Sequence, residues 1–435
     1  MYRFASTHLD LWKKKSQRLP LLIRGARQVG KTWLVREHGL SYPNFVEINL
    51  EAEPDYRKIF KELFGKPQEL IAALSFLSGK EIKPGTLLFI DEIQNSKEAI
   101  LSLRYFKENL PELHVIAAGS LLEFSFQDLS YPVGRIEFFH LFPLNFEEYL
   151  TAISHDDWLD TIHNAHAKTP LPEPIHEKLL EAVALYCLIG GMPEAVKAYV
   201  ETQNLQRCQE VQQVLVASFR EDFYKYASKT NIEYLQISFQ SIPRLLGQKW
   251  KYSHVDPDVK SRELASVLHL LEKSGLAYRT CHSSANGLPL GAQINPKKFK
   301  IFFLDVGLCQ RLLGLSLAQL YLEKKTMLAH RGGIAEQFVA QELVSMTPPN
   351  QAPQLFYWHR EERSAMAEVD FLLENPSGVV PIEVKSAREG RLKSLHFFLQ
   401  EKKAFIYKAY KISAANFATH DKVESIPFYA VKSIQ

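Results

Sequence analysis

Two short segments of the sequence combine residue types that bind and react with phosphate groups. The first, GARQVGKT at residues 25–32, satisfies the pattern G-x-x-x-x-G-K-[ST] and lies between an apolar run and a helical pattern. Glycines let such a loop curl until its backbone N–H groups point inward at phosphate oxygens. Lys31 is expected to reach the β- and γ-phosphates of ATP, and the Thr32 hydroxyl to bind Mg²⁺. The alternative is a chance match on a turn; the candidate nucleotide-binding residues are Gly25, Ala26, Arg27, Gln28, Val29, Gly30, Lys31 and Thr32.

The second segment, LLFIDE at residues 87–92, brings two carboxylates to the end of an apolar strand. Adjacent carboxylates at such a place are costly unless a cation or a substrate needs them. Asp91 is expected to hold Mg²⁺ through water, and Glu92 to orient and deprotonate the attacking water. A solvated strand end is the alternative, which the presence of Lys31 upstream disfavours. Together the two segments predict ATP and Mg²⁺ as cofactors.

Two further residues are weaker candidates for this site. Ser120 ends the apolar run VIAAGS, where a polar side chain could sense the γ-phosphate or could be a plain strand-end serine. Arg135 lies in YPVGRIEFF, and an arginine supplied to the γ-phosphate would stabilise charge in the transition state. It could act in its own subunit or from a neighbour, but an isolated arginine is more often a surface ion-pair partner.

The elements that would position these residues predict an α/β fold. Continuous apolar runs in LPLLIRG, FVEINLE, LLFID and VIAAGS indicate strands buried on both faces, as in a parallel sheet flanked by helices. An extra strand between the two motifs, FVEINLE, suits the P-loop branch that uses an adjacent glutamate as base. From about residue 150 to 230 the pattern is helical. A short helix, turn, helix and strand then fit a winged helix-turn-helix, and its few basic residues (Arg262, Lys273) leave DNA reading and protein contact equally open.

The last third of the chain contains a second group of candidate residues. GGIAEQFVAQEL predicts a helix with Glu336 near its start, and AEVDFLL and VVPIEVK predict two strands joined by a turn at 375–378. Period-2 alternation puts Glu383 and Lys385 on one face of their strand. If Asp370 lies beside Glu383 across the hairpin, two carboxylates could bind magnesium, and the lysine could position or activate a water.

The segments resemble those of AAA-like ATPases of bacteria and archaea, which carry an N-terminal P-loop core, a winged helix and a C-terminal domain of unknown function. The resemblance rests on RGARQVGKTWLV, LLFIDEIQ, VIAAGSLLEF, VGRIEFFHLFPLNFEEYL, GGMPEAV, KIFFLDVGL and EVDFLL…PIEVKS, from about residue 20 to 390. It implies ATP binding and the order of four parts. These are a P-loop ATPase core at 1–150, a helical region at 151–230, a winged helix-turn-helix at 231–296 and a nuclease-like domain at 297–435. Ala26 stands where relatives commonly have proline, which changes little because the loop acts through its backbone.

The C-terminal pattern is similar to the PD-(D/E)XK nuclease superfamily, with an acidic residue on a helix, an Asp on one strand and E-x-K on the next. The resemblance implies that Glu336, Asp370 and Glu383 are metal ligands and that Lys385 is the activating base or charge stabiliser. The metal would supply the attacking hydroxide. The alternative is a retained fold whose carboxylate–lysine pair is structural, or whose surface only holds DNA.

Length and composition limit the class of protein. A chain of 435 residues is expected to form two to four domains. No apolar stretch is long enough to span a membrane, and the N-terminus shows no cleavable leader, so we expect a cytoplasmic protein without a membrane partner. Four widely spaced cysteines suit a reducing compartment and predict no zinc site. A net charge of +3 is too small to establish a nucleic-acid partner by itself.

We therefore expect an enzyme that binds and hydrolyses ATP, with DNA and a second copy of the chain as candidate partners. The favoured hypothesis is a DNA-processing ATPase that acts through the winged helix and the nuclease-like domain, whose metal-dependent nuclease activity is left open. The alternative is an ATP-dependent regulatory or signalling switch whose C-terminal domain is an inactive binding scaffold. The first predicts DNA-stimulated ATP hydrolysis, and the second predicts nucleotide-dependent assembly with little response to DNA.

Overall fold

The computed structural model describes residues 1–120, 122, 134–226, 229–314, 332–362 and 365–434, and they form two compact units. The first unit contains Met1–Phe142, Lys273–Gly275 and Thr347–Ala352, and the second contains the other described residues. Parts of the segments VIAAGSLLEF and YPVGRIEFF fall on residues 121 and 123–133, which lie outside the described residues.

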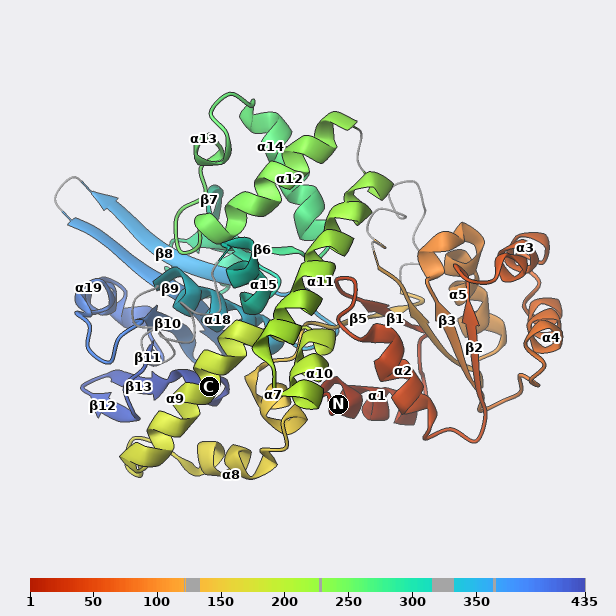
Figure 1. Ribbon diagram of the computed structural model, residues 1–435, viewed down its shortest axis with the longest axis horizontal. Coiled ribbons are helices and arrows are strands. Elements are labelled where there is room, and N and C mark those ends of the chain that lie inside the picture. Colours follow the sequence, from red (N-terminus) through yellow and green to blue (C-terminus); the bar gives the residue numbers. More distant parts are fainter. Residues whose placement is uncertain (121, 123–133, 227–228, 315–331, 363–364, 435) are drawn as a thin grey trace. The chain divides into compact units, whose positions relative to one another are not determined.

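The first unit is built on a five-stranded parallel sheet with the strand order β2-β3-β4-β1-β5 (Figure 1). This confirms the predicted α/β class and the parallel sheet. β1 to β4 lie where the apolar runs predicted strands, whereas β5 was not predicted. In the sheet β4, and not β2, lies between β1 and β3. The strands are β1 (Leu21–Arg24), β2 (Phe45–Asn49), β3 (Leu87–Asp91), β4 (His114–Ala118) and β5 (Glu137–His140).

Helices cover both faces of this sheet. Alternate strand residues such as Val46, Leu88 and Val115 share one core with residues of α3, α4 and α5. The strand residues between them, such as Phe89 and Ile116, are also buried, and α2 packs on β3 and β4. Burial on both faces explains the apolar runs of β3 and β4, whereas the residues of β2 are fully buried only at alternate positions. The helices are α1 (Ala5–Lys14), α2 (Lys31–Gly39), α3 (Pro54–Glu62), α4 (Pro67–Ser78) and α5 (Lys97–Asn109).

The second unit begins with helices, in the stretch from about residue 150 to 230 where the sequence pattern is helical. The boundary expected between residues 150 and 151 lies inside the first of them, α7.

Among the described residues no single helix is long and apolar enough to cross a membrane, and α9 with α10 meets that test only as a pair bent by 119°. The helices are α7 (Phe146–Ala152), α8 (Asp156–Asn164), α9 (Glu173–Ile189), α10 (Pro193–Thr202), α11 (Leu205–Tyr226) and α12 (Lys229–Arg244).

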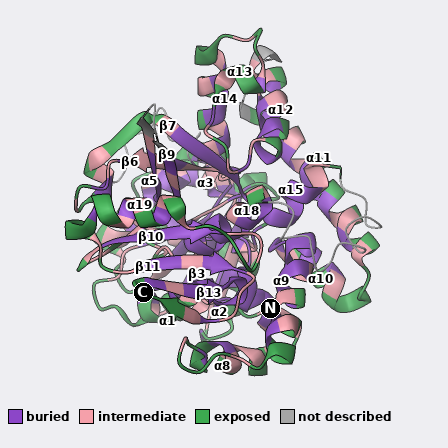
Figure 2. Cartoon of the chain, turned by 90° about the vertical axis from the view of Figure 1, so that its left-hand side faces the viewer, coloured by how far each residue is buried: buried purple, intermediate pink, exposed green. Residues whose placement is uncertain are grey.

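An eight-stranded mixed sheet forms the rest of the second unit, with the order β12-β13-β11-β10-β9-β8-β6-β7. Its central strands β10 and β11 are largely buried (Figure 2). Helices α18 (Gly332–Ser345) and α19 (Lys393–Glu401) pack against it. The strands are β6 (Ala277–Ser283), β7 (Ile294–Phe303), β8 (Leu355–Glu362), β9 (Ala365–Asn375), β10 (Gly378–Val384), β11 (Ala409–Ser413), β12 (Ala418–His420) and β13 (Val423–Pro427).

The segment expected to form a winged helix contains α13 (Tyr252–Val255), α14 (Ser261–Lys273) and β6, in the predicted order. β6 pairs antiparallel with β7 and parallel with β8, so these strands belong to the same sheet as the C-terminal strands. The boundary expected between residues 296 and 297 therefore lies inside β7. It divides a strand pair that the structure keeps together.

The segments GGMP and FFLDVGL meet inside the second unit. Asp305 is fully buried and accepts hydrogen bonds from the backbone N–H of Gly191 (2.6 Å) and of Leu308 (2.9 Å), where it caps α15 (Val306–Leu312). Gly190 has φ 77°, and a Cβ there would lie 2.1 Å from Asp305 Oδ1. These two segments therefore serve the packing of the unit through one close contact.

Candidate functional site

The phosphate loop connects β1 to the start of α2 in a tightly curled conformation. Positive φ angles occur at Gly25 (150°), Gln28 (66°) and Gly30 (96°), and Gly30 is the N-cap residue of α2. A Cβ on Gly25 would lie 2.2 Å from the carbonyl oxygen of Leu141, so only glycine fits there. The backbone N–H groups at the start of α2 are thus placed as an anion-binding site requires.

Arg3 supports the phosphate loop, and we did not predict it. This buried side chain donates from Nη1 to the carbonyl oxygen of Val29 (2.9 Å) and from Nη2 to that of Phe142 (2.6 Å). It therefore holds the loop against the chain that leaves β5. A single arginine 26 residues before its partner carries no local sequence signal.

Lys31, Thr32 and Asp91 form the centre of the candidate ATP site. The Thr32 hydroxyl donates to Asp91 Oδ2 at 2.9 Å, and Lys31 Nζ donates to the carbonyl oxygens of Gly25 (3.1 Å) and Ala26 (2.9 Å). Burial lowers the pKa of Lys31 to about 8, although the carboxylates of Glu92 and Asp91 oppose this shift. Burial also raises the pKa of Asp91, against the hydrogen bond from Thr32. Both groups are thus shielded from water. A charged ligand interacts more strongly with them in this environment than it would in water.

Glu92 and Ser120 lie at the ends of the neighbouring strands β3 and β4. Glu92 has φ 51° and accepts a hydrogen bond on Oε2 from Gln94 Nε2 at 2.5 Å. A Cβ on Gly119 would lie 2.2 Å from Gln94 Oε1, so Gln94 extends from Glu92 to the end of β4. Ser120 is buried directly after Gly119. Gln94, in the segment LLFIDEIQ, was not predicted as a site residue; its side chain links the two strand ends.

Arg135 lies in a surface ion-pair network. Its Nε is 3.0 Å from Glu108 Oε1, the same oxygen that Arg104 contacts at 3.0 Å. About half of the Arg135 side chain is exposed (47%). This placement corresponds to the alternative of a surface ion-pair partner, and a role at the γ-phosphate stays a prediction.

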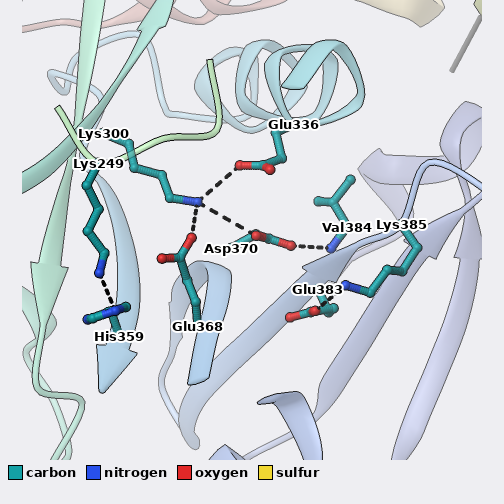
Figure 3. Close-up of polar contacts among 9 residues, drawn as sticks. All are labelled: Lys249, Lys300, Glu336, His359, Glu368, Asp370, Glu383, Val384 and Lys385. Atoms are coloured by element: carbon teal, nitrogen blue, oxygen red, sulfur yellow. Dashed lines mark hydrogen bonds and ion pairs between the residues drawn. The ribbon is translucent and has the colours of Figure 1, made fainter. Parts of the chain in front are cut away.

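The helix and hairpin expected near the C-terminus are present and bring the four predicted residues near one another. β9 and β10 pair antiparallel, and Glu336 lies on α18. Asp370 Oδ2 accepts a hydrogen bond from the backbone N–H of Val384 at 2.7 Å. Lys385 Nζ lies 2.5 Å from Glu383 Oε1 (Figure 3). The predicted strand face therefore exists, with its lysine paired to its own glutamate.

Two charged residues that we did not predict complete this cluster. Lys300, from β7, lies with its ammonium 2.5 Å from Glu368 Oε1, 3.1 Å from Glu336 Oε2 and 3.7 Å from Asp370 Oδ1 (Figure 3). Burial alone lowers the pKa of Lys300, but the surrounding carboxylates outweigh it and raise that pKa. Burial raises the pKa of Glu336 to about 7 although Lys300 opposes it. Glu368 shares a strand face with Asp370, so period-2 alternation could have found it.

The two candidate metal sites differ in how well they suit an ion. Mg²⁺ takes oxygen ligands and keeps several waters, and the Thr32 hydroxyl and Asp91 carboxylate supply such oxygens side by side. In the C-terminal cluster the Lys300 ammonium lies among the oxygens that a metal would need. In the part of the chain that the structure describes, no group of three or more His, Cys, Asp or Glu side chains is arranged to hold a metal ion. Metal binding by Glu336, Asp370 and Glu383 stays a prediction.

Three protein families match parts of the chain. Residues 17–150 match the AAA domain, and residues 180–319 and 331–429 match two domains of unknown function, DUF8612 and DUF4143. Together with the parallel sheet and the phosphate loop, the first match makes the N-terminal part an AAA-like P-loop ATPase domain. No curated protein matches the chain.

Solved structures that match the chain include a Walker-type ATPase of Pyrococcus abyssi, with 18% identity over 71% of this chain and 94% of that one, and a TM-score of 0.45. The RuvB Holliday junction branch migration motor of Thermotoga maritima has 15% identity over 63% of this chain and 88% of that one, with a TM-score of 0.30. Drosophila ORC bound to DNA has 15% identity over 71% of this chain and 85% of that one, with a TM-score of 0.26. At this level of likeness no function of this chain follows.

Proposed function

We propose that this protein binds ATP with Mg²⁺ and hydrolyses it. The observation that carries the proposal is the Thr32–Asp91 hydrogen bond beside Lys31, directly at the start of α2. When bound, Mg²⁺ neutralises charge on the phosphate oxygens. Lys31 exchanges its bonds to the loop carbonyls for bonds to phosphate, and Glu92 accepts the proton of the attacking water. Ser120 contacts the γ-phosphate, and Arg135 reaches it in its own subunit or across an interface.

We further propose that ATP turnover is coupled to DNA. The winged-helix segment at 231–296 and the nuclease-like part at 297–435 are the proposed DNA-contacting parts. The other two proposed parts are the ATPase core at 1–150 and the helical region at 151–230. Support comes from exposed basic residues near α13 and α14 and at the start of β7, which suit phosphate contacts: Lys251, Lys260, Arg262 and Lys297.

The DNA proposal is tested by ATP hydrolysis with single-stranded, duplex and branched DNA. We expect DNA to raise the rate of ATP hydrolysis, and we expect the Lys260→Glu/Arg262→Glu protein to show a weaker increase. The control Lys58→Glu changes an exposed lysine of the ATPase unit and should retain the full increase. An ATPase that none of these DNA forms stimulates would contradict the coupling to DNA.

A second function is an ATP-dependent regulatory or signalling switch whose C-terminal part is an inactive binding scaffold. The Lys300 ammonium inside the carboxylate cluster favours it over a metal-dependent nuclease. The discriminating experiment incubates the protein with Mg²⁺ or Mn²⁺ and labelled linear, single-stranded or branched DNA, with and without ATP. Cleavage that is lost in Lys385→Ala would establish a nuclease, and its response to Lys31→Ala would show whether ATP controls it. No cleavage with intact ATP hydrolysis supports the scaffold.

We also propose that the protein works in the cytoplasm and assembles with further copies of itself when ATP is bound. The supporting consideration is that an arginine such as Arg135 can complete an ATP site of a neighbouring subunit. Light scattering of the protein with and without ATP tests the assembly. A mass that ATP leaves unchanged would contradict it.

A further inference from the structure

Lys300 has the position of a cation in a coordination shell. Its side chain is fully buried, and carboxylate oxygens from α18 and β9 surround the ammonium at 2.5 to 3.7 Å (Figure 3). The lysine projects from a paired strand whose backbone is fixed on both sides: β6 pairs with β7, and Lys249 forms a bridge with Lys300. Strand pairing therefore sets where this ammonium lies.

The cluster and the ammonium require each other. Burying three carboxylates or one ammonium alone is unfavourable because each loses its hydration. Removing one member of a buried ion pair leaves an uncompensated charge, which is more costly than keeping the pair. Lys300 is therefore held in the cluster by the same carboxylates that it neutralises.

The ammonium and a metal ion would compete for the same oxygens. Mg²⁺ and Ca²⁺ bind carboxylate oxygens at about 2.0 to 2.6 Å. An ion at such distances from Glu336, Glu368 and Asp370 together would overlap the Lys300 nitrogen, which already lies 2.5 to 3.7 Å from them. Lys385, the residue that would activate water beside a metal, is paired with Glu383 instead.

We propose that Lys300 is a built-in cation that takes the place of a divalent metal among Glu336, Glu368 and Asp370, so that the second unit binds no metal there. The proposal does not depend on ATP hydrolysis, because it concerns residues of the second unit alone. It identifies the cluster as a metal-independent structural site. Neutralising Lys300 is expected to allow the three carboxylates to bind a divalent cation.

The test measures Mn²⁺ binding by electron paramagnetic resonance, with the full chain free of nucleotide. All proteins carry Asp91→Asn, so that the ATP site does not contribute Mn²⁺. We expect the Asp91→Asn protein to show no tight Mn²⁺ site. The Asp91→Asn/Lys300→Gln protein should gain a site that binds Mn²⁺ at least about tenfold more tightly than any residual binding to the Asp91→Asn protein. Adding Asp370→Asn should remove the new site. The matched control is Lys300→Arg, which keeps the positive charge and should gain none.

Two results of the Mn²⁺ binding measurement would overturn the proposal. One is Mn²⁺ binding by the Asp91→Asn protein that is lost when Asp370→Asn is added, since the cluster would then hold a metal with Lys300 present. The other is a folded Lys300→Gln protein, verified by circular dichroism, that gains no Mn²⁺ site. If the Lys300→Gln protein does not fold, the proposal is tested by the Tm of the Asp91→Asn protein, measured with Mn²⁺ and with EDTA. Equal Tm values support the proposal, and a Tm raised by Mn²⁺ only while Asp370 is present overturns it.

Discussion

The hydroxyl of Thr32 donates a hydrogen bond of 2.9 Å to Asp91 Oδ2, although the two residues are 59 positions apart. One stands in the first turn of α2 and the other ends β3, so the bond joins the phosphate loop to the acidic strand end. Parallel strands end at the same edge of a sheet, which is where ligands bind in open α/β folds. The pair therefore defines the place where Mg²⁺ and the phosphates of ATP are expected.

Lys31→Ala is expected to weaken ATP binding by roughly 10- to 100-fold, because a hydrogen bond to a charged group contributes about 1.5–3 kcal/mol. Isothermal titration with Mg-ATP measures the change. Lys58→Ala, on an exposed lysine of α3 paired with Asp55, is the matched control and should leave the affinity unchanged. Equal affinities of the Lys31→Ala and wild-type proteins would remove Lys31 from the site.

Gln94→Ala is expected to lower kcat about tenfold with little change in KM. Gln94 holds the Glu92 carboxylate through a 2.5 Å hydrogen bond, so its loss misplaces the base without removing a contact to ATP. Steady-state ATP hydrolysis separates the two constants. The control is Asn95→Ala, because the Asn95 side chain contacts only the backbone oxygen of Glu92 among the hydrogen bonds seen here. A raised KM with unchanged kcat would assign Gln94 to ATP binding instead.

Stability is expected to depend on pH through Glu342, a buried residue of α18 that accepts a hydrogen bond from the Phe146 N–H. Burial raises the pKa of Glu342 to about 8. The positive charge of Lys432 lowers this pKa, and the negative charges of Glu147 and Glu148 raise it further. The folded state therefore holds a proton that the unfolded state releases at about pH 4.3. This group's contribution is fully present below that pH and is lost as the pH rises toward 8.

Glu342→Gln keeps the hydrogen-bond acceptor but cannot ionise. We expect it to be more stable than the wild type at pH 8, by roughly 1 kcal/mol or more, and to be closest to it near pH 5. Urea unfolding at a series of pH values measures the difference. A difference between the two proteins that stays constant from pH 5 to 8 would show that Glu342 does not titrate in this range.

Gly190→Ala is expected to destabilise the second unit by roughly 3 kcal/mol or more, because a Cβ there would meet the buried carboxylate of Asp305 at 2.1 Å. Gly79 also has a positive φ (66°), but it lies in the left-handed helical region with no atom within 4 Å of an added Cβ, so Gly79→Ala should cost only about 1 kcal/mol. Thermal unfolding compares the two. Equal losses would contradict the added cost expected from the close approach to Asp305.

Local patterns predicted those parts of the structure that depend on neighbouring residues. The phosphate loop was predictable because its motif and the strand and helix beside it, β1 and α2, follow one another directly in the sequence. The hairpin of β9 and β10 was also predictable, since alternation and a turn at 375–378 specify it. Asp91 and Glu92 could be placed at a strand end for the same reason.

Contacts between distant segments were not predictable in this way. Lys300 lies in the run KKFKIFF, where it resembles an ordinary strand lysine, yet the fold buries it against Glu368, which is 68 residues later. Arg3 is equally unremarkable in sequence until β5 and the phosphate loop are placed beside it. In both cases the packing of the whole unit determines which residues are partners. The local sequence pattern does not reveal that packing.

The most direct test of ATP hydrolysis at this site is the steady-state rate of phosphate release from Mg-ATP by the wild type and by Glu92→Gln. We predict measurable turnover by the wild type, and a rate about 10² to 10⁴-fold lower in Glu92→Gln. ATP affinity should stay within about threefold, because Gln fills the same space and Lys31 and Thr32 hold the phosphates and the ion. Turnover by Glu92→Gln at the wild-type rate would contradict the assignment of Glu92 as the base and with it the proposed site.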